Sequence, residues 1–135
     1  MVAYKFLIVD DSAIIRETMS DFSIDLNHAA RTVPSGEEAI KVIKKEDFDL
    51  VFLDIYMPGI NGLETLKQIR AVKPMQKVII MTSDRAEEVF DDAIVKVQKV
   101  SGFINKPFSL EVFSNCVKTV LVLNGKFSHK KESIY

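Results

Sequence analysis

Acidic, hydroxyl and ammonium side chains stand directly after the short apolar runs of this 135-residue chain. The set comprises Asp10 and Asp11 after residues 6–9, Asp54 after 50–53, Thr82 and Ser83 after 78–81, and Lys106 after 103–105. Neighbouring carboxylates repel one another, and either protonation or a hard cation relieves that repulsion. Oxygen ligands suit Mg²⁺, while a lysine and a hydroxyl suit a phosphoryl group. The set therefore indicates Mg²⁺-assisted phosphoryl transfer onto a carboxylate.

Each of these residues, taken alone, also fits a purely structural role. Asp, Ser and Thr often cap the helix that follows a strand, and a lysine before a proline is a weak signal. Asp54 fits a cap poorly, because Ile55 and Tyr56 follow it before the turn at Pro58-Gly59. The joint occurrence of such residues after four of the apolar runs favours a functional site.

Five apolar runs predict β-strands. The stronger runs are Phe6–Val9, Leu50–Leu53 and Val78–Met81, and weaker ones lie around Ala29–Val33 and Phe103–Ile104. The runs at 50–53 and 78–81 show no polar alternation, which is typical of strands in a parallel sheet that is covered on both faces. Amphipathic stretches lie between the runs. The alternation predicts an α/β fold of five strand–helix units, which binds ligands at the carboxyl ends of its strands.

Three of the expected helices carry clear start or stop signals. The start signals are a capping box at Ser35–Glu38 and a Ser109 cap for the last helix. The stop signals are Pro74 for the helix over 63–69 and Asn124-Gly125 for the last helix. They follow the known preferences for helix ends. We expect one domain over residues 1–124 and a polar tail over 125–135.

The composition excludes several classes of protein. Eighteen Lys and Arg against 19 Asp and Glu give a net charge of −1, so no basic surface for nucleic acid is expected. No apolar run exceeds four residues, whereas a membrane span needs about 18. The acidic pair Asp10 and Asp11 does not fit a signal peptide. The single cysteine, Cys116, fits a reducing compartment. We expect a cytoplasmic protein that contacts neither nucleic acid nor membrane.

In these residues the sequence resembles the receiver domain of two-component response regulators. The motifs that carry the resemblance are Leu7-Ile8-Val9-Asp10-Asp11-Ser12, the segment DIYMPGING at 54–62, Thr82-Ser83, and Phe103-Ile104-Asn105-Lys106-Pro107-Phe108. They occur in the family's order and on the predicted elements. The resemblance implies a flavodoxin-like, doubly wound fold whose five-stranded parallel sheet has the order 2-1-3-4-5.

The resemblance implies that Asp54 accepts a phosphoryl group from a histidine kinase or a histidine phosphotransfer protein. Asp11 would bind Mg²⁺ directly, and Asp10 would act largely through water. Asp54 and the backbone carbonyl of Tyr56 would complete the protein ligands. We also expect the ring of Tyr56 to shield the phosphoryl group from water. The chain would catalyse only its own phosphorylation and dephosphorylation and would not otherwise be an enzyme.

The same resemblance implies that Thr82 and Lys106 hold the phosphoryl oxygens. Phe103 would be an aromatic switch that turns inward as Thr82 moves toward the phosphoryl group. Its alternative role is that of an ordinary core aromatic. The Lys106–Pro107 bond would be cis. A downstream protein would bind the face formed by the fourth helix, the fifth strand and the fifth helix.

Two features depart from the family pattern. The segment 82–106 is slightly long, and Lys99-Val100 stands where a small Gly-Ala pair is expected before Ser101-Gly102. The helix expected near Asp84–Val100 has a wide apolar surface. That surface fits either a deeply buried helix or a partner-binding face.

Three other functions are compatible with parts of the sequence. The first is a degenerate receiver that binds proteins without being phosphorylated. The second is a Mg²⁺-dependent phosphatase with an aspartyl-phosphate intermediate, but such enzymes want Asp-x-Asp after the first strand, and Asp10 and Asp11 are adjacent. The third is a nucleotide or flavin module, yet the five glycines form neither a dinucleotide fingerprint nor a phosphate-binding loop.

Overall fold

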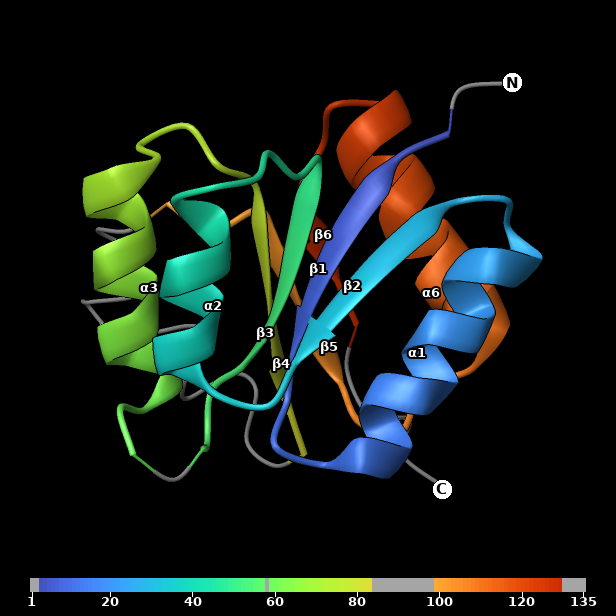
Figure 1. Cartoon of the computed structure of the whole chain (residues 1–135). Helices are drawn as coiled ribbons and strands as arrows, with labels where there is room; N and C mark the ends of the chain where they lie inside the picture. The colour runs from blue at the N-terminus through green and yellow to red at the C-terminus, as the bar shows by residue number, and fades with distance from the viewer. Residues whose placement is uncertain (1–2, 58, 84–98, 130–135) are drawn as a thin grey trace.

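A six-stranded parallel sheet forms the centre of the molecule (Figure 1). The structure, a computed structural model, describes residues 3–57, 59–83 and 99–129. Its strands are β1 (Lys5–Val9), β2 (Ala29–Val33), β3 (Leu50–Asp54), β4 (Val78–Thr82), β5 (Gly102–Asn105) and β6 (Phe127–Ser128). They lie in the order β2-β1-β3-β4-β5-β6, and every neighbouring pair is parallel. The predicted flavodoxin-like order is confirmed.

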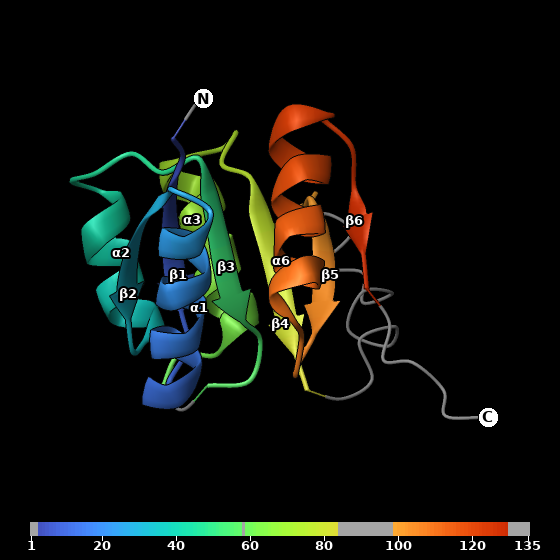
Figure 2. The ribbon, with the colours of Figure 1, turned by 90° about the vertical axis from the view of Figure 1, so that its right-hand side faces the viewer.

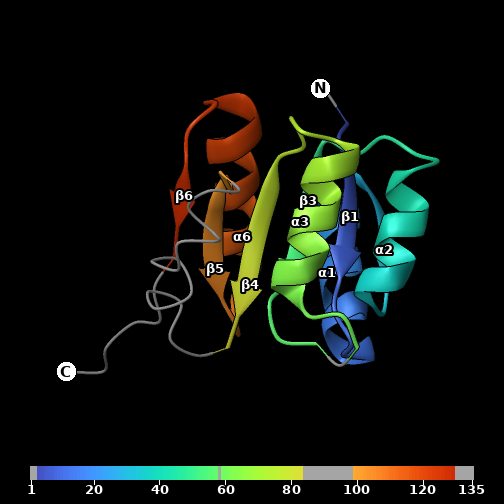
Figure 3. The same cartoon turned by 90° about the vertical axis from the view of Figure 1, so that its left-hand side faces the viewer.

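Helices cover both faces of this sheet. They are α1 (Ala13–Asp25), α2 (Gly36–Ile43), α3 (Gly62–Val72) and α6 (Leu110–Val117), which continues as the π-helical turn η1 (Lys118–Val122). Helices α2 and α3 lie on one face and α1 and α6 on the other, as Figure 1, Figure 2 and Figure 3 show. This two-sided cover explains the unbroken apolar runs of the inner strands. Most of the helix expected near Asp84–Val100 lies outside the described residues.

A side-chain cap starts each of the four α-helices in the described part of the chain. The capping residues are Ser12, Ser35, Asn61 and Ser109, and each accepts a hydrogen bond from the backbone N–H three residues later. The predicted caps at Ser35 and Ser109 are confirmed, and α3 ends before Pro74 as predicted. Each cap contributes about 1 kcal/mol by satisfying a helix donor that would otherwise lack a partner.

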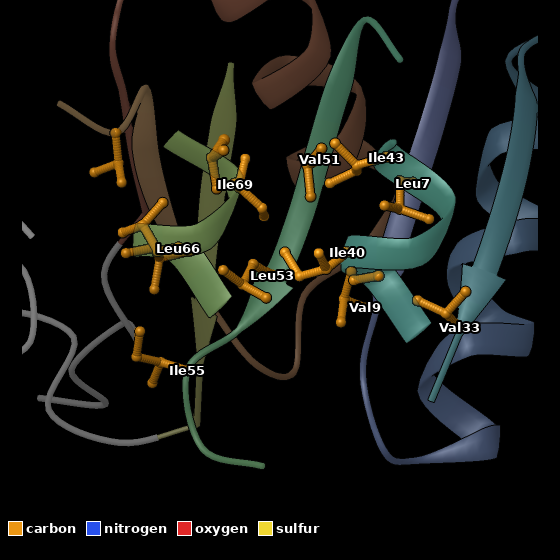
Figure 4. Packing of buried hydrophobic residues seen from close by; sticks show 14 of the residues in the cluster. Leu7, Val9, Val33, Ile40, Ile43, Val51, Leu53, Ile55, Leu66 and Ile69 are labelled. Carbon is orange, nitrogen blue, oxygen red and sulfur yellow. The ribbon is translucent and has the colours of Figure 1, made fainter. Parts of the chain in front are cut away.

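Two apolar clusters, one on each face of the sheet, hold the layers together. On the face shown in Figure 4, side chains of β1 and β3 such as Val51 and Leu53 meet α2 and α3. On the other face the rings of Phe6, Phe52 and Phe113 lie 5.1 to 5.9 Å apart between centroids. Burying one such side chain contributes about 1.5–3 kcal/mol. The clusters therefore fix the strands whose ends carry the candidate site.

The last helix ends in a wider turn than a regular α-helix. The Leu123 N–H donates to the Lys118 carbonyl over 2.9 Å, five residues back. Asn124 then adopts a φ of 57°, so the predicted stop at Asn124-Gly125 is confirmed. The ammonium of Lys77 donates to the Val120 carbonyl over 3.1 Å and to Asn124 Oδ1 over 2.6 Å. These bonds satisfy the end of the helix.

The sheet contains one strand more than the five predicted. Residues 127–128 lie in the segment expected to be a polar tail, and they pair with β5. A two-residue strand is too short to show a hydrophobic alternation, and its pairing uses the backbone, so the sequence pattern carries no sign of it. Across residues 3–57, 59–83 and 99–129, no helix has the length and apolar character needed to cross a bilayer.

The loop after β3 depends on Gly62, and this dependence can be tested. A Cβ at Gly62 would overlap backbone atoms of Asp54 and Ile55. We expect Gly62→Ala to lower the free energy of unfolding by about 1–3 kcal/mol, because such overpacking forces backbone shifts. A Cβ at Gly125 would meet its nearest neighbour, Thr119 Cγ2, at an ordinary 3.5 Å. Gly125→Ala is therefore the matched control. Equal urea midpoints for the two variants would contradict this reading of the loop.

Candidate functional site

The carboxyl ends of β1, β3, β4 and β5 meet along one edge of the sheet, the lower edge in Figure 1. β3 lies between β1 and β4, and β4 lies beside β5. Residues that end these strands or directly follow them therefore come together although they are up to 96 positions apart in sequence. This is the edge at which open α/β sheets bind ligands.

A half-buried lysine joins two buried carboxylates at this edge. The Lys106 Nζ lies 2.8 Å from Asp10 Oδ2 and 3.4 Å from Asp54 Oδ2. Asp10 is fully buried, Asp54 is 4% exposed, and the Lys106 side chain is 14% exposed. Charges this deeply buried persist only when they are paired and hydrogen-bonded. The three side chains therefore form one ionic cluster.

Backbone donors complete the hydrogen bonding of both carboxylates. The Ser12 N–H donates to Asp10 Oδ1 over 2.9 Å, and the Tyr56 N–H donates to Asp54 Oδ1 over 3.2 Å. Each carboxylate thus has one oxygen on a backbone N–H two residues later, while its other oxygen faces Lys106. This arrangement fixes the rotation of both groups, because each oxygen has its own partner.

Arg16 is a contributor that sequence reasoning missed. Its Nη1 donates to the Asp10 carbonyl over 2.7 Å. It lies on α1, one turn after the Ser12 cap, and so ties the start of that helix to the end of β1. A side chain that contacts a backbone carbonyl leaves no pattern of residue types, so no sequence signal pointed to it.

The carboxylates of Asp10, Asp11 and Asp54 are close enough to share one cation. Each offers an oxygen, and these oxygens all lie within 4.8 Å of one another. Asp11 is exposed, while Asp10 and Asp54 are buried. A set of hard carboxylate oxygens with one side open to water is what Mg²⁺ takes as ligands. The donor set therefore fits the predicted cation, and the Tyr56 carbonyl as a further ligand stays a prediction.

Burial raises the pKa of Asp54 to about 6. The positive charge of Lys106 acts to lower this pKa, and the negative charge of Asp10 adds to the rise. Burial also acts to lower the pKa of Lys106, but its hydrogen bond to Asp10 and the charge of Asp54 outweigh burial, so that pKa lies above its usual value. Lys106 is therefore charged, and Asp54 is the group of this pair that changes charge near neutral pH.

Thr82 lies on β4 and Phe103 on β5. Thr82 ends β4 and is fully buried, and its carbonyl accepts the Lys106 N–H over 2.7 Å. Phe103 is 4% exposed and belongs to the apolar cluster on the α2 and α3 side. Its ring is thus turned inward in this structure. The roles of both residues as a switch stay predictions.

The structure brings together Asp10, Asp11, Asp54 and Lys106, as the positions after the strands predict. The Lys106–Pro107 bond is cis, as expected. The ring of Tyr56 is 61% exposed beside Asp54, and its shielding role stays a prediction. Lys99 and Val100 stand where the family pattern has a small Gly-Ala pair. Lys99 adopts a φ of 53°, and Val100 is buried in the core.

Comparison with known proteins gives consistent matches. The sequence profile described as "Response regulator receiver domain" matches residues 6–118. Sporulation initiation phosphotransferase F of Bacillus subtilis is 30% identical over 125 residues, which cover 93% of this chain and 99% of that protein. Chemotaxis protein CheY-3 of Vibrio cholerae is 34% identical over 109 residues, with 78% and 82% covered. The probable C4-dicarboxylate response regulator DctR of Bacillus subtilis is 34% identical over 110 residues, which cover 80% of this chain. The match spans only 48% of the length of that protein.

Solved structures agree with these sequence matches. The chemotaxis response regulator CheY4 of Vibrio cholerae has a TM-score of 0.81 at 28% identity, with 89% of this chain and all of that chain covered. The response regulator protein TrrA of Thermotoga maritima, solved in complex with Mg(2+)-BeF, has a TM-score of 0.77 at 31% identity, with 87% and 99% covered. Together with the strand order and the profile match, these findings show that the chain belongs to the receiver-domain family of two-component response regulators.

Proposed function

We propose that the chain is a phosphorylation-activated switch in which Asp54 accepts a phosphoryl group with Mg²⁺. The donor is a histidine kinase or a histidine phosphotransfer protein. The output is a changed surface around β5 and α6 that binds a downstream protein in the cytoplasm. The observation that carries the proposal is the ionic cluster in which Lys106 meets buried Asp10 and Asp54, with Asp11 close by.

The transfer forms one bond and breaks one. A carboxylate oxygen of Asp54 attacks phosphorus as the bond from phosphorus to the donor histidine nitrogen breaks. With the donor ring protonated on its other nitrogen, the electron pair of the broken bond stays on the ring, which leaves an acyl phosphate on Asp54 and a neutral imidazole on the donor. The Lys106 ammonium lies 3.4 Å from Asp54 Oδ2, where it can pair with a phosphoryl oxygen. The Thr82 hydroxyl is suited to donate to another. The metal would supply charge neutralisation on the phosphoryl oxygens, held by the three aspartates.

Charge balance explains why a cation is needed. Three carboxylates face one ammonium at this edge, and a phosphoryl group brings further negative charge. A divalent cation restores the balance without a proton on Asp54, which must be deprotonated to attack. The Mg(2+)-BeF complex of the Thermotoga relative and the phosphotransferase name of the Bacillus relative support the same cation and the same class of reaction for this chain.

Phosphoryl uptake from acetyl phosphate tests this proposal directly. We expect intact-mass measurement to show one added phosphoryl group with acetyl phosphate and Mg²⁺, and none when a chelator removes the metal. Asp54→Ala should abolish the gain, because no carboxylate remains to attack. Asp21→Ala, which removes an exposed aspartate on α1, is the matched control and should gain the group normally. A folded wild-type protein that gains no mass with Mg²⁺ would instead favour the phosphorylation-independent binding module.

The raised pKa of Asp54 predicts a pH-dependent stability when no metal is bound. The folded protein holds this proton up to about pH 6, while the unfolded chain loses it near 3.8, so the wild type loses stability as the pH rises through about 6. A shift of this size corresponds to roughly 3 kcal/mol. In chelator at pH 7.5 we expect Asp54→Asn to be the more stable protein, by about 1–3 kcal/mol.

This advantage should shrink as the pH falls from 7 toward 4, because the wild-type carboxyl becomes protonated and its burial costs less. Urea unfolding at several pH values measures it. Asp21→Asn, at an exposed position, is the control and should differ little from wild type throughout. A stability gap between Asp54→Asn and wild type that stays constant from pH 7.5 to pH 4.5 would show that burial of the Asp54 charge is not its cause.

A further inference from the structure

The outer edge of β5 is covered by the chain's own C-terminal segment, which we call the strap and define as Lys126–His129. Within it, β6 runs parallel to β5, with Phe127 opposite Gly102 and Ser128 opposite Phe103. Figure 2 shows β6 on the outer side of β5, beyond the last helix. The edge that would otherwise accept an added strand is therefore occupied by residues of the same chain.

Three hydrogen bonds attach the strap to β5 and to the residue before it. The Phe127 N–H donates to the Ser101 carbonyl over 3.0 Å, and the His129 N–H donates to the Phe103 carbonyl over 3.2 Å. The Asn105 N–H donates to His129 Nδ1 over 3.3 Å. In this last bond the histidine ring takes the place of a backbone acceptor. The strap thus follows β5 up to the residue before Lys106.

A glycine makes room for this close approach. Gly102 has a φ of 150°, and a Cβ there would overlap the carbonyl of Phe127. Only glycine lets the two backbones approach this closely at that position. The pairing of Gly102 with the strap is therefore a specific fit, since another residue on β5 at this point would push the strap away.

The strap is nevertheless weakly held. Lys126 and Ser128 are exposed, while Phe127 and His129 are half-buried. Phe127 packs at the margin of the apolar cluster on the α6 side. A two-residue strand with so little buried apolar surface opens at a small fraction of the free energy needed to unfold the whole domain. Such a segment can exchange between attached and released states while the sheet stays intact.

The residues that hold the strap include one candidate site residue and the direct neighbour of another. The carbonyl of Phe103, the expected switch residue, accepts the hydrogen bond from the His129 N–H. Asn105, which donates to the His129 ring, directly precedes Lys106. The Lys106 N–H is in turn bound to the Thr82 carbonyl, and its ammonium joins Asp10 and Asp54. In the proposed function a phosphoryl group on Asp54 pairs with this ammonium, which belongs to the residue directly after the end of β5 to which the strap is attached.

We propose that the strap is a built-in competitor for the β5 edge. It favours the unphosphorylated arrangement of β5 and closes that edge to an extended peptide segment of a partner. Phosphorylation of Asp54 releases it. This inference rests on the proposed function. By linkage, the factor by which release of the strap strengthens binding of the phosphoryl group's analogue equals the factor by which the bound analogue favours release of the strap.

Amide hydrogen exchange tests the proposal, with Mg²⁺ plus beryllium fluoride as a stable stand-in for the phosphoryl group. In wild type we expect the Phe127 and His129 amides, which donate to β5 carbonyls, to exchange about fivefold faster or more when the probe is bound. Amides of β1 and β3 should not accelerate. Unchanged or slower exchange at Phe127 and His129, with the probe bound, overturns the proposal.

A pair of variants tests the reverse direction. His129→Ala removes the ring that accepts the Asn105 N–H, whereas Ser128→Ala changes an exposed neighbour and keeps every strap bond described here. We expect His129→Ala, and also a chain shortened to end at Gly125, to bind the Mg²⁺ and beryllium fluoride probe more tightly than wild type, while Ser128→Ala matches wild type. Thermal unfolding checks that each variant is folded.

The outcomes separate the two proposals. A folded wild-type protein that binds no probe and gains no phosphoryl group contradicts the proposed function, and the release of the strap falls with it. A wild-type protein that binds the probe, together with variants whose affinities equal that of wild type, contradicts the strap proposal alone. Tighter binding in the two strap variants, with normal binding in Ser128→Ala, supports both.

Discussion

The buried ion cluster of Lys106, Asp10 and Asp54 is the interaction on which the site depends. Taking such charges out of water costs several kcal/mol per ion, so the cluster forms only where three strand ends meet in fixed positions. The strand order supplies that condition, since β1, β3, β4 and β5 are consecutive in the sheet. Backbone donors at Ser12 and Tyr56 then take the remaining carboxylate oxygens. The strand order of the fold therefore determines where the charged groups of the site lie.

The same cluster explains how a small chemical change can reach a surface. The ammonium of Lys106 stands at the end of β5, whose inner edge pairs with β4 and whose outer edge pairs with the strap. Moving a two-state switch from 1:99 to 99:1 requires roughly 5.5 kcal/mol of differential stabilisation. In the proposed switch, a phosphoryl group that pairs with Lys106 and a divalent cation would supply this energy, because both charges act where water is largely excluded.

Much of this arrangement was predictable from the sequence, and the reasons are specific. Strands buried on both faces read as unbroken apolar runs, so Leu50–Leu53 and Val78–Met81 located β3 and β4, and the polar residues that follow them located the site. Contacts that use the backbone left no such pattern. The pairing of Phe127–Ser128 with β5 and the bond from Arg16 to the Asp10 carbonyl are of this kind. The inward position of Phe103 and the wide turn after Val117 likewise depend on packing that no local pattern records.

The central claim is that Asp54, held beside Lys106, is the residue that carries the phosphoryl group. The most direct measurement treats the protein with acetyl phosphate and Mg²⁺, reduces the acyl phosphate with borohydride, and locates the resulting homoserine by peptide mass spectrometry. The account predicts this label at position 54 alone. A label at position 10 or 11, or a folded protein with no label at any aspartate, would contradict it.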